Sequence, residues 1–586
     1  MTRLLRPLLA TVLVALTAAG CVRIPDSGIV HTIDDGVVDT GPSVRYEPPA
    51  PPAGGSPTDV VYGYLDAMLA FPVSVDVATE YLTPDAARTW RPDAGATIYR
   101  GPRATSESGT DVATATLSLS VDATLDARGR YAGAGGSTRE STWTLERVGG
   151  EWRIANPPDG LLIEQRFFES TYRPVSLYFL DASSSRLVED PVFLPAGESL
   201  STALVARLLR GPSGLLGGSA RTAFPDGMRL DGSVPVRRDG VAEVDLSGDP
   251  GSLDQRRREL VSAQVVRTLG QVPGITGVRI DVGGAALDVA GVDRTQPVGA
   301  WTELDPPAGR GVGQVFAIRD DALVVVNGST TAEFAGGLAG GTSDVADFRV
   351  DPRLRRIAVV PRSRDRVVVA DIASEPDLVG PAAYLGAAVL KPVWDAEERL
   401  WVADRVGGGS RLSVVTEGAV RRIALGGLAD TRLEGFELSP DSSRMVLIAR
   451  TSDRAQRVYV ASVVADEDGA PIGIADVKPL PLASAGLGQV RSVAWRSATS
   501  VVALASAGTS SPQSYVARVD GSSVTGGSLT GDSLLGDVGA DRVLASGSES
   551  TPIYIGDRDQ RLWLRDASGR WQRVAGGPLR VPSYPG

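Results

Sequence analysis

The sequence predicts a multidomain protein, with two α+β domains followed by an all-β propeller of about six blades. Two stretches, at about 58–165 and 172–295, each combine an amphipathic helix with strand patterns. From about 310 to 580 only short strand patterns with Gly-rich punctuation occur, and similar groups recur roughly every 40 to 60 residues. Repeats of this length are typical of propeller blades, and five or seven blades also fit them.

The N-terminus carries an export signal. Arg3 and Arg6 form a short basic region, and an apolar run of about twelve residues follows and ends shortly before Cys21. This run is well short of the roughly 20 residues that a membrane-crossing helix needs. Residues 1–20 are therefore predicted to be a signal peptide that is removed.

The residues Ala18-Ala19-Gly20-Cys21 resemble the lipobox of bacterial lipoproteins, although Ala18 stands where Leu is commoner. The resemblance implies that Cys21 becomes an N-palmitoyl and S-diacylglycerol cysteine, whose acyl chains hold the protein on the extracytoplasmic face of the cell membrane. Cys21 is the only cysteine of the chain, which favours lipidation over a chance cysteine and excludes an intramolecular disulfide. Residues 21–57 are Pro-rich, and we expect a lipidated spacer there.

The first domain, 58–165, opens with a predicted helix that has one apolar face. Alternating strand patterns follow at 113–121, 141–148 and 151–154. A helix followed by an antiparallel, curved sheet resembles the nuclear transport factor 2-like (NTF2-like) and cystatin-like α+β domains.

The second domain, 172–295, alternates strands with two amphipathic helices, the first near 199–210 and the second from about 252 to 269. Its short motifs resemble the GerMN domain, and this resemblance implies no catalytic role, because glycine and proline set turns while the apolar positions fill a core. The motifs are Leu209-Arg210-Gly211-Pro212, Phe224-Pro225-Asp226-Gly227, Val244-Asp245-Leu246-Ser247, Gln264-Val265-Val266-Arg267-Thr268-Leu269, Pro273-Gly274-Ile275 and Val282-Gly283-Gly284.

In the C-terminal stretch, 310–580, each repeat pairs an aromatic entry strand with an apolar second strand. Ser439-Pro440-Asp441 resembles the turn between inner strands of TolB-like and WD-type propellers. Asp351 and Asp395 occupy corresponding positions of other repeats, so we expect these carboxylates, with that of Asp441, to shape turns rather than to catalyse. The predicted second strands are 357–360, 400–403, 445–448 and 501–504.

The sequence offers little chemistry beyond the anchor. The single histidine, His31, lies in the spacer, which argues against His-based triads and histidine-rich zinc sites. The glycine runs at 336–337, 340–341 and 407–409 lack the Lys-Ser/Thr of a phosphate loop and are predicted to be hairpin turns. Residues 466–469 lack the ligand spacing of a calcium loop. We expect no catalytic residue, no cofactor and no metal site.

The net charge of −11 argues against nucleic acid as a partner. The layout of lipobox, spacer, α+β domains and propeller resembles the LpqB family of actinobacterial lipoproteins over essentially the full length. The resemblance implies an accessory of the MtrAB two-component system that contacts the extracytoplasmic domain of the sensor histidine kinase and affects cell-envelope homeostasis and division. Two alternatives stay open: a binder of cell-wall glycan or peptidoglycan, which needs clustered exposed aromatics, and a propeller hydrolase, which needs a pair of carboxylates.

Overall fold

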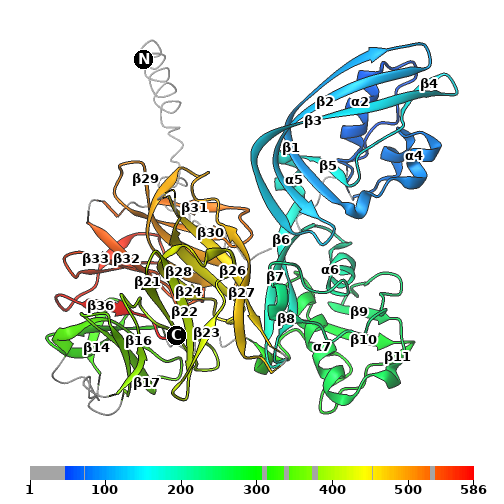
Figure 1. Cartoon of the computed structure of the whole chain (residues 1–586). Coiled ribbons are helices and arrows are strands. Elements are labelled where there is room, and N and C mark those ends of the chain that lie inside the picture. Colours follow the sequence, from blue (N-terminus) through cyan, green and yellow to red (C-terminus); the bar gives the residue numbers. More distant parts are fainter. Residues whose placement is uncertain are drawn as a thin grey trace, which may run out of the picture. The chain divides into compact units, whose positions relative to one another are not determined.

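The structure is a computed structural model that describes residues 46–71, 73–305, 313–334, 342–372, 381–451, 453, 455–466, 468–527, 535–536 and 538–586 (Figure 1). The described residues belong to one compact unit. None of their helices is both long enough and apolar enough to cross a membrane. The predicted signal peptide, Cys21 and His31 lie outside the described residues.

The first domain begins with helix α2 (Pro57–Ala67), which is started by a capping box. The Ser56 hydroxyl accepts a hydrogen bond from the Asp59 N–H at 3.2 Å, and the Asp59 carboxylate accepts one from the Ser56 N–H at 2.9 Å. The shorter helices are α3 (Asp76–Glu80), α4 (Pro84–Thr89) and α5 (Gln165–Thr171), and the strands are β1 (Gly95–Ser108), β2 (Val112–Asp126), β3 (Tyr131–Val148), β4 (Glu151–Ile154) and β5 (Leu161–Glu164).

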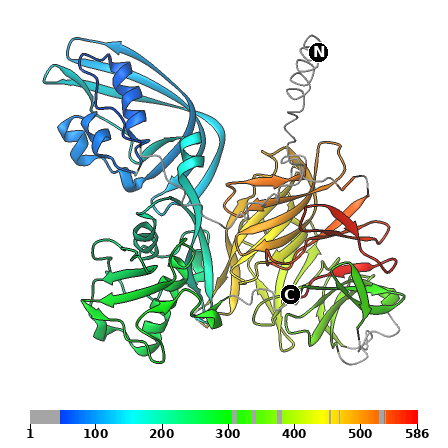
Figure 2. The same cartoon turned by 180° about the vertical axis from the view of Figure 1, so that it is seen from behind.

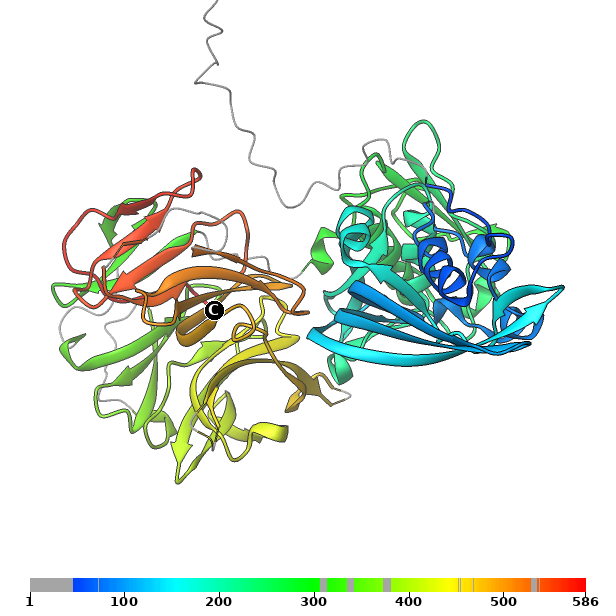
Figure 3. The same ribbon diagram turned by 90° about the horizontal axis from the view of Figure 1, so that it is seen from above.

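These strands form one curved sheet in the order β4-β3-β2-β1-β5, and α2 lies along it (Figures 1 and 3). The Tyr64 ring on α2 packs between Trp90 and Trp143, with ring centroids 5.8 and 5.7 Å away. Helix α2 and strands β2, β3 and β4 agree with the sequence prediction, whereas the antiparallel strand β1 was not predicted. The additional strand β5 is parallel to β1 and was not predicted.

The second domain is built from two small sheets around one core, to which helices α6 (Leu200–Leu208) and α7 (Gln255–Leu269) contribute (Figure 2). One sheet has the order β7-β6-β8. In the other, β10 pairs with β9, β11 and β12. The strands are β6 (Tyr172–Asp181), β7 (Leu187–Pro195), β8 (Ala220–Arg221), β9 (Val241–Leu246), β10 (Gly277–Val282), β11 (Ala285–Ala286) and β12 (Gln296–Pro297).

Polar side chains of α7 and of the segment after it bind the backbone of β6. Thr268 Oγ1 accepts from the Tyr178 N–H at 3.1 Å, and Gln264 Nε2 donates to the Tyr178 carbonyl at 2.9 Å. Gln271 accepts from the Ser176 N–H at 2.8 Å. Residues 264, 268 and 271 are four and three positions apart, so their side chains lie on one side and all face β6. Their hydrogen bonds satisfy backbone groups of β6 that would otherwise need a paired strand. This explains Gln264 and Thr268 of the Gln264–Leu269 motif, while Arg267 pairs with Asp305 at 2.7 Å.

The C-terminal domain contains six four-stranded antiparallel sheets in its described residues, numbered here as blades 1 to 6 (Figure 3). Blade 1 takes its inner strand from the C-terminus, because β36 pairs with β13 and thereby closes the ring. The predicted second strands lie in β17, β21, β25 and β29, and their apolar residues are almost fully buried.

The propeller strands are listed by blade, inner strand first. Blade 1 has β36 (Arg580–Ser583), β13 (Gln314–Arg319), β14 (Ala322–Asn327) and β15 (Thr330–Glu333); blade 2 has β16 (Val345–Val350), β17 (Arg356–Pro361), β18 (Arg366–Asp371) and β19 (Ala382–Leu385); blade 3 has β20 (Val393–Trp394), β21 (Leu400–Val406), β22 (Gly409–Thr416) and β23 (Ala419–Ile423). Blade 4 has β24 (Arg432–Leu438), β25 (Arg444–Arg450), β26 (Gln456–Ala465) and β27 (Pro471–Pro479); blade 5 has β28 (Leu487–Ser497), β29 (Ser500–Ala507), β30 (Gln513–Arg518) and β31 (Val524–Gly526); blade 6 has β32 (Ala540–Leu544), β33 (Tyr554–Asp557), β34 (Leu562–Arg565) and β35 (Trp571–Arg573).

Candidate functional site

Three carboxylates that the sequence places in equivalent turns each follow the inner strand of a blade. Asp351 Oδ1 accepts from the Arg355 N–H at 2.6 Å. Asp395 Oδ1 accepts from the Arg399 N–H at 2.8 Å, and Asp441 Oδ1 accepts from the Ser443 N–H at 3.0 Å. All three side chains are buried. The prediction that they shape turns is confirmed, and each carboxylate is engaged by its own turn.

The other local motifs are also turns where the structure describes them. Gly407 has φ +58°, and Gly407 and Gly408 form the hairpin turn between β21 and β22, as predicted, while Gly409 is the first residue of β22. Asp466 lies between β26 and β27, and its Oδ1 accepts from the Ala470 N–H at 2.8 Å. The runs at 336–337 and 340–341 lie outside the described residues. Within the described part of the chain, no group of three or more His, Cys, Asp or Glu side chains is placed to hold a metal ion.

The candidate site is the contact between the second domain and blades 3 to 5, which we call the interdomain contact. Its centre is Arg444, the first residue of β25, whose side chain is completely buried. Arg444 Nη1 donates to the Ala498 carbonyl at 3.2 Å, and Nη2 donates to the Glu189 carbonyl on β7. A single guanidinium therefore joins two blades to the second domain.

Two carboxylates of β7 lie beside this guanidinium. Asp190 is buried, and its two oxygens accept from the Ser213 hydroxyl and the Ser213 N–H, both at 2.7 Å. The Glu189 carboxylate accepts from the Ser176 hydroxyl at 2.8 Å. Burial raises the pKa of both the Glu189 and the Asp190 carboxyls, and the Arg444 charge opposes this rise. The contact is thus polar and poorly hydrated.

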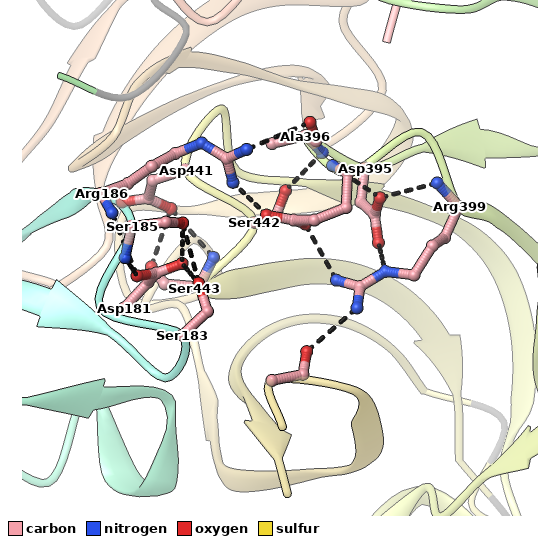
Figure 4. Close-up of polar contacts among 12 residues, drawn as sticks. Asp181, Ser183, Ser185, Arg186, Asp395, Ala396, Arg399, Asp441, Ser442 and Ser443 are labelled. Atoms are coloured by element: carbon pink, nitrogen blue, oxygen red, sulfur yellow. Dashed lines mark hydrogen bonds and ion pairs between the residues drawn. The ribbon is translucent and has the colours of Figure 1, made fainter. Parts of the chain in front are cut away.

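A second group of contacts surrounds Arg186, which follows the turn between β6 and β7 (Figure 4). Its guanidinium forms an ion pair with Glu397 and donates to the Ala396 carbonyl at 3.3 Å. The Ala396 N–H in turn donates to Ser442 Oγ at 2.9 Å, which links the turns of blades 3 and 4. On the other side, Asp181 Oδ1 accepts from the Arg186 N–H at 3.1 Å and so orders the turn that presents this arginine.

A close backbone approach forms the third part of the interdomain contact. Ser462 Oγ on β26 donates to the Leu215 carbonyl at 2.8 Å. Gly217 has φ +45°, and a Cβ atom there would lie 2.6 Å from Asp476 Oδ2. A Cβ atom on Gly218 would lie 3.2 Å from the Val464 side chain. Gly217 is favoured because its φ is positive, and at both positions a Cβ atom would press against a side chain of blade 4.

Sequence reasoning missed the interdomain contact. The turn containing Asp441 was found from local spacing, but Arg444 resembles any other strand arginine in sequence. The available signal was the pair Gly217-Gly218 directly after two leucines, which does not fit the surrounding helix and strand patterns.

The fold and the interdomain contact define a class of protein: a multidomain protein in which an α+β domain is joined to a propeller of six described blades. Comparison with known families is consistent with this class. The model described as "Lipoprotein LpqB, N-terminal domain" matches residues 50–169. The model described as "Sporulation and spore germination" matches 176–288, and "Lipoprotein LpqB beta-propeller domain" matches 321–585.

Curated relatives match along nearly the whole chain. A protein named Lipoprotein LpqB from Cutibacterium acnes is 29% identical over 98% of both chains. Proteins of the same name from Streptomyces coelicolor and Thermobifida fusca are 27% and 26% identical, over at least 96% of each chain. The chain belongs to the LpqB family of lipoproteins, and its second domain is a GerMN domain. The finer resemblance of the first domain to NTF2-like domains stays a prediction.

Proposed function

We propose that the protein is a non-catalytic lipoprotein that is held on the extracytoplasmic face of the cell membrane by acyl chains on Cys21. There it acts as an accessory of a two-component sensor histidine kinase of the MtrAB type. It contacts the extracytoplasmic domain of the kinase and so affects cell-envelope homeostasis and division. Membership of a lipoprotein family supports the anchoring part of this proposal.

The observation that carries the proposal is the interdomain contact. The completely buried Arg444 joins the GerMN domain to two blades, so the two domains can offer a partner one continuous surface. One oxygen of each of Asp351, Asp395 and Asp441 is engaged by its own turn, and all three side chains are buried. These features suit the binding of a protein better than the hydrolysis of a ligand.

The glycan alternative has less support from the described residues. Their exposed aromatic side chains are Tyr46 and Tyr62, with 43% and 37% of the residue exposed. Tyr62 belongs to the first domain, and the Tyr46 backbone pairs with Phe71 of that domain. The Tyr62 hydroxyl also accepts a hydrogen bond from the Ala104 N–H at 3.0 Å. A carbohydrate platform usually stacks sugar rings on several aligned aromatic rings. No such row lies on the described GerMN or propeller surface.

Photocrosslinking in intact cells tests the proposal. A photoreactive phenylalanine analogue replaces exposed apolar residues of the GerMN domain and the propeller, one at a time: Val236, Leu385, Val420 and Ile472. We expect at least one position to capture the extracytoplasmic domain of a sensor kinase, identified by mass spectrometry. The control is the same position in a Cys21→Ala background, where loss of the membrane anchor should greatly reduce capture. The proposal is wrong if none of the four positions captures a kinase while the protein is correctly anchored.

A further inference from the structure

The axis of the propeller carries a cluster of charged side chains that the proposed function does not use. Asp347 and Arg349 lie on β16, Glu437 on β24 and Arg542 on β32, while Lys391 directly precedes β20. The charge of Lys391 interacts with all four of the others. The ion pairs Arg349–Glu437 and Asp347–Arg542 join blade 2 to blades 4 and 6, which places these residues at the axis. The Arg349 side chain also donates to the carbonyl of Pro392, the residue after Lys391, at 3.4 Å. We call these five residues the axial cluster.

Most groups of the axial cluster are already paired. Arg349 forms an ion pair with Glu437 across the axis, and it also donates to the Tyr584 carbonyl at 3.1 Å and the Pro392 carbonyl at 3.4 Å. The Asp347 carboxylate forms ion pairs with Arg364 Nη2 at 2.6 Å and with Arg542 Nη2 at 3.3 Å. The two carboxylates of the cluster are therefore already occupied by arginines.

Two donor groups remain without a partner in the described part of the chain. Arg542 Nη1 is buried and makes no hydrogen bond. No described carboxylate lies within ion-pair distance of Lys391 Nζ, although Asp347 and Glu437 are near enough to act on its charge. A buried cationic donor without an acceptor is costly, so Arg542 Nη1 favours an anion beside it, and the partly buried Lys391 adds a positive charge that pairs with no described carboxylate.

The charges around Lys391 are also predominantly positive in their effect on its ammonium group. Burial lowers the pKa of the Lys391 ammonium well below its ordinary value, and the charges of Arg349 and Arg542 lower it further against the opposing effects of Glu437 and Asp347. The axis is nevertheless reached by solvent, because the side chains of Glu437 and Arg542 remain 21% and 27% exposed.

We propose that the axis of the propeller is a binding site for a carboxylate group, in which Lys391 and Arg542 each hold one of its two oxygens. The two unpartnered donors match the two oxygens of a planar carboxylate, whereas a phosphate would leave further oxygens without donors. The carboxylate can belong to a small molecule or to an acidic side chain of a bound protein. This site is independent of the proposed kinase accessory role.

Binding at this site is coupled to protonation. A carboxylate beside Lys391 favours the ammonium form, so the pKa of Lys391 is higher in the complex than in the free protein. Between these two pKa values, binding takes up a proton. Affinity is therefore greatest below the pKa of the free protein and falls as the pH rises toward the pKa of the complex.

The chain offers an unusually direct test, because Lys391 and Lys478 are its only lysines. The full-length protein in detergent micelles is produced with lysine labelled with ¹³C at Cε, and the two Cε signals are followed by NMR as the pH changes. Lys478 lies exposed on β27 and serves as the internal control. The variant Lys391→Arg assigns the signals. Sodium acetate is the probe, and sodium chloride at equal ionic strength is the reference.

We expect saturating acetate to raise the pKa of Lys391 by about one unit, while the Lys478 signal follows the chloride reference. The variant Arg542→Gln should weaken acetate binding by about tenfold, since it removes one charged donor. Arg542→Lys keeps the charge and should weaken binding less. The wild-type titration stands by itself even if a variant folds poorly.

Two further probes define the ligand. Acetyl-glutamate-amide tests a carboxylate carried by a protein, and inorganic phosphate tests another anion. A shift with acetate, or with acetyl-glutamate-amide alone, supports the site, and the second result assigns it to a protein-borne carboxylate. A Lys391 pKa that stays unchanged with both carboxylates, or that rises with phosphate only, overturns the proposal.

Discussion

The Arg444 guanidinium is completely buried and donates to carbonyl groups of two different segments, at Glu189 and Ala498. Its Nε atom is buried without a partner, and Asp441 Oδ2 lies 4.0 Å away. A cation in this position contributes through the hydrogen bonds that it supplies to otherwise isolated carbonyls. It therefore determines how firmly the GerMN domain is held on the propeller.

We expect Arg444→Met to lower the free energy of unfolding by about 3 kcal/mol, because it leaves buried acceptors without a donor. Chemical denaturation measures this loss. Arg450→Met is the matched control, since Arg450 lies at the other end of the same strand, is 42% exposed and pairs with Glu434 at 2.8 Å. A surface pair of this kind contributes less than about 1 kcal/mol. Equal losses in the two variants would contradict the importance given to Arg444.

The carboxyls of Glu189 and Asp190 make the stability depend on pH. Because burial raises the pKa of both, the folded protein keeps protons that the unfolded chain releases above about pH 4. Their contribution therefore favours folding at acidic pH and is lost as the pH rises through the raised pKa values. Asp190→Asn should flatten this fall, which denaturation at a series of pH values measures. A profile as steep as that of the wild type would show that Asp190 is not its source.

The pKa of Asp453 is shifted in the opposite direction to the pKa values of Glu189 and Asp190. Hydrogen bonds from the Thr451 hydroxyl and, at 3.0 Å, from the Ala455 N–H lower the pKa of the Asp453 carboxyl to about 2. Its contribution is present above about pH 4 and is lost as the pH falls toward 2. Asp453→Asn should thus reduce the loss of folding stability as the pH falls below about 4. Asp190→Asn should instead reduce the loss of folding stability as the pH rises above about 4. The two variants together separate the two effects.

The turn between β2 and β3 contacts the GerMN domain through backbone atoms. The Gly129 carbonyl accepts from the Phe193 N–H on β7 at 2.8 Å. Gly129 has φ +85°, and a Cβ atom there would lie 2.8 Å from the Phe193 carbonyl oxygen. The Arg210 guanidinium adds a hydrogen bond to the Ala127 carbonyl at 2.8 Å. This turn therefore binds the first domain to β7 and to Arg210 of the GerMN domain.

We expect Gly129→Ala to destabilise this contact more than Gly135→Ala does. Both glycines have positive φ, so both substitutions carry the backbone cost of about 1–2 kcal/mol. Gly135 has open space around its missing side chain, whereas Gly129 faces the Phe193 carbonyl. The difference should be at least about 1 kcal/mol, and hydrogen exchange at the Phe193 N–H should accelerate only in Gly129→Ala. Equal exchange in both variants would contradict this docking role.

The elements differ in how far sequence could predict them. The second strands of the blades were predictable because they are buried on both faces, so their apolar runs are continuous. Strand β36 was not, because Arg580–Ser583 is short and pairs with residues more than two hundred positions away. The same holds for the candidate sites. Asp395 was found because its turn is local, whereas the axial cluster takes Lys391, Glu437 and Arg542 from different blades.

At the scale of the whole molecule, the described domains form one compact unit, and the predicted Pro-rich spacer precedes them in the chain. The first domain contacts the GerMN domain through Gly129, and the GerMN domain contacts the propeller through Arg444. In the proposed function, a membrane receptor meets the surfaces of three domains that these contacts join. What remains to be supplied is confinement to the membrane, which in the proposed function comes from Cys21.

Cys21→Ala tests this confinement. One acyl chain gives only marginal membrane binding, while two or more give a stable anchor, so loss of the modified cysteine should remove the acyl anchor. We expect no incorporation of labelled palmitate, no cleavage by the lipoprotein peptidase, and loss of the correctly processed, acyl-anchored form from the membrane fraction. His31→Ala, ten residues further along, should be labelled and cleaved as the wild type is. If Cys21→Ala still incorporated palmitate, the anchor would lie elsewhere in the chain, and the membrane-confined accessory role would need a different physical basis.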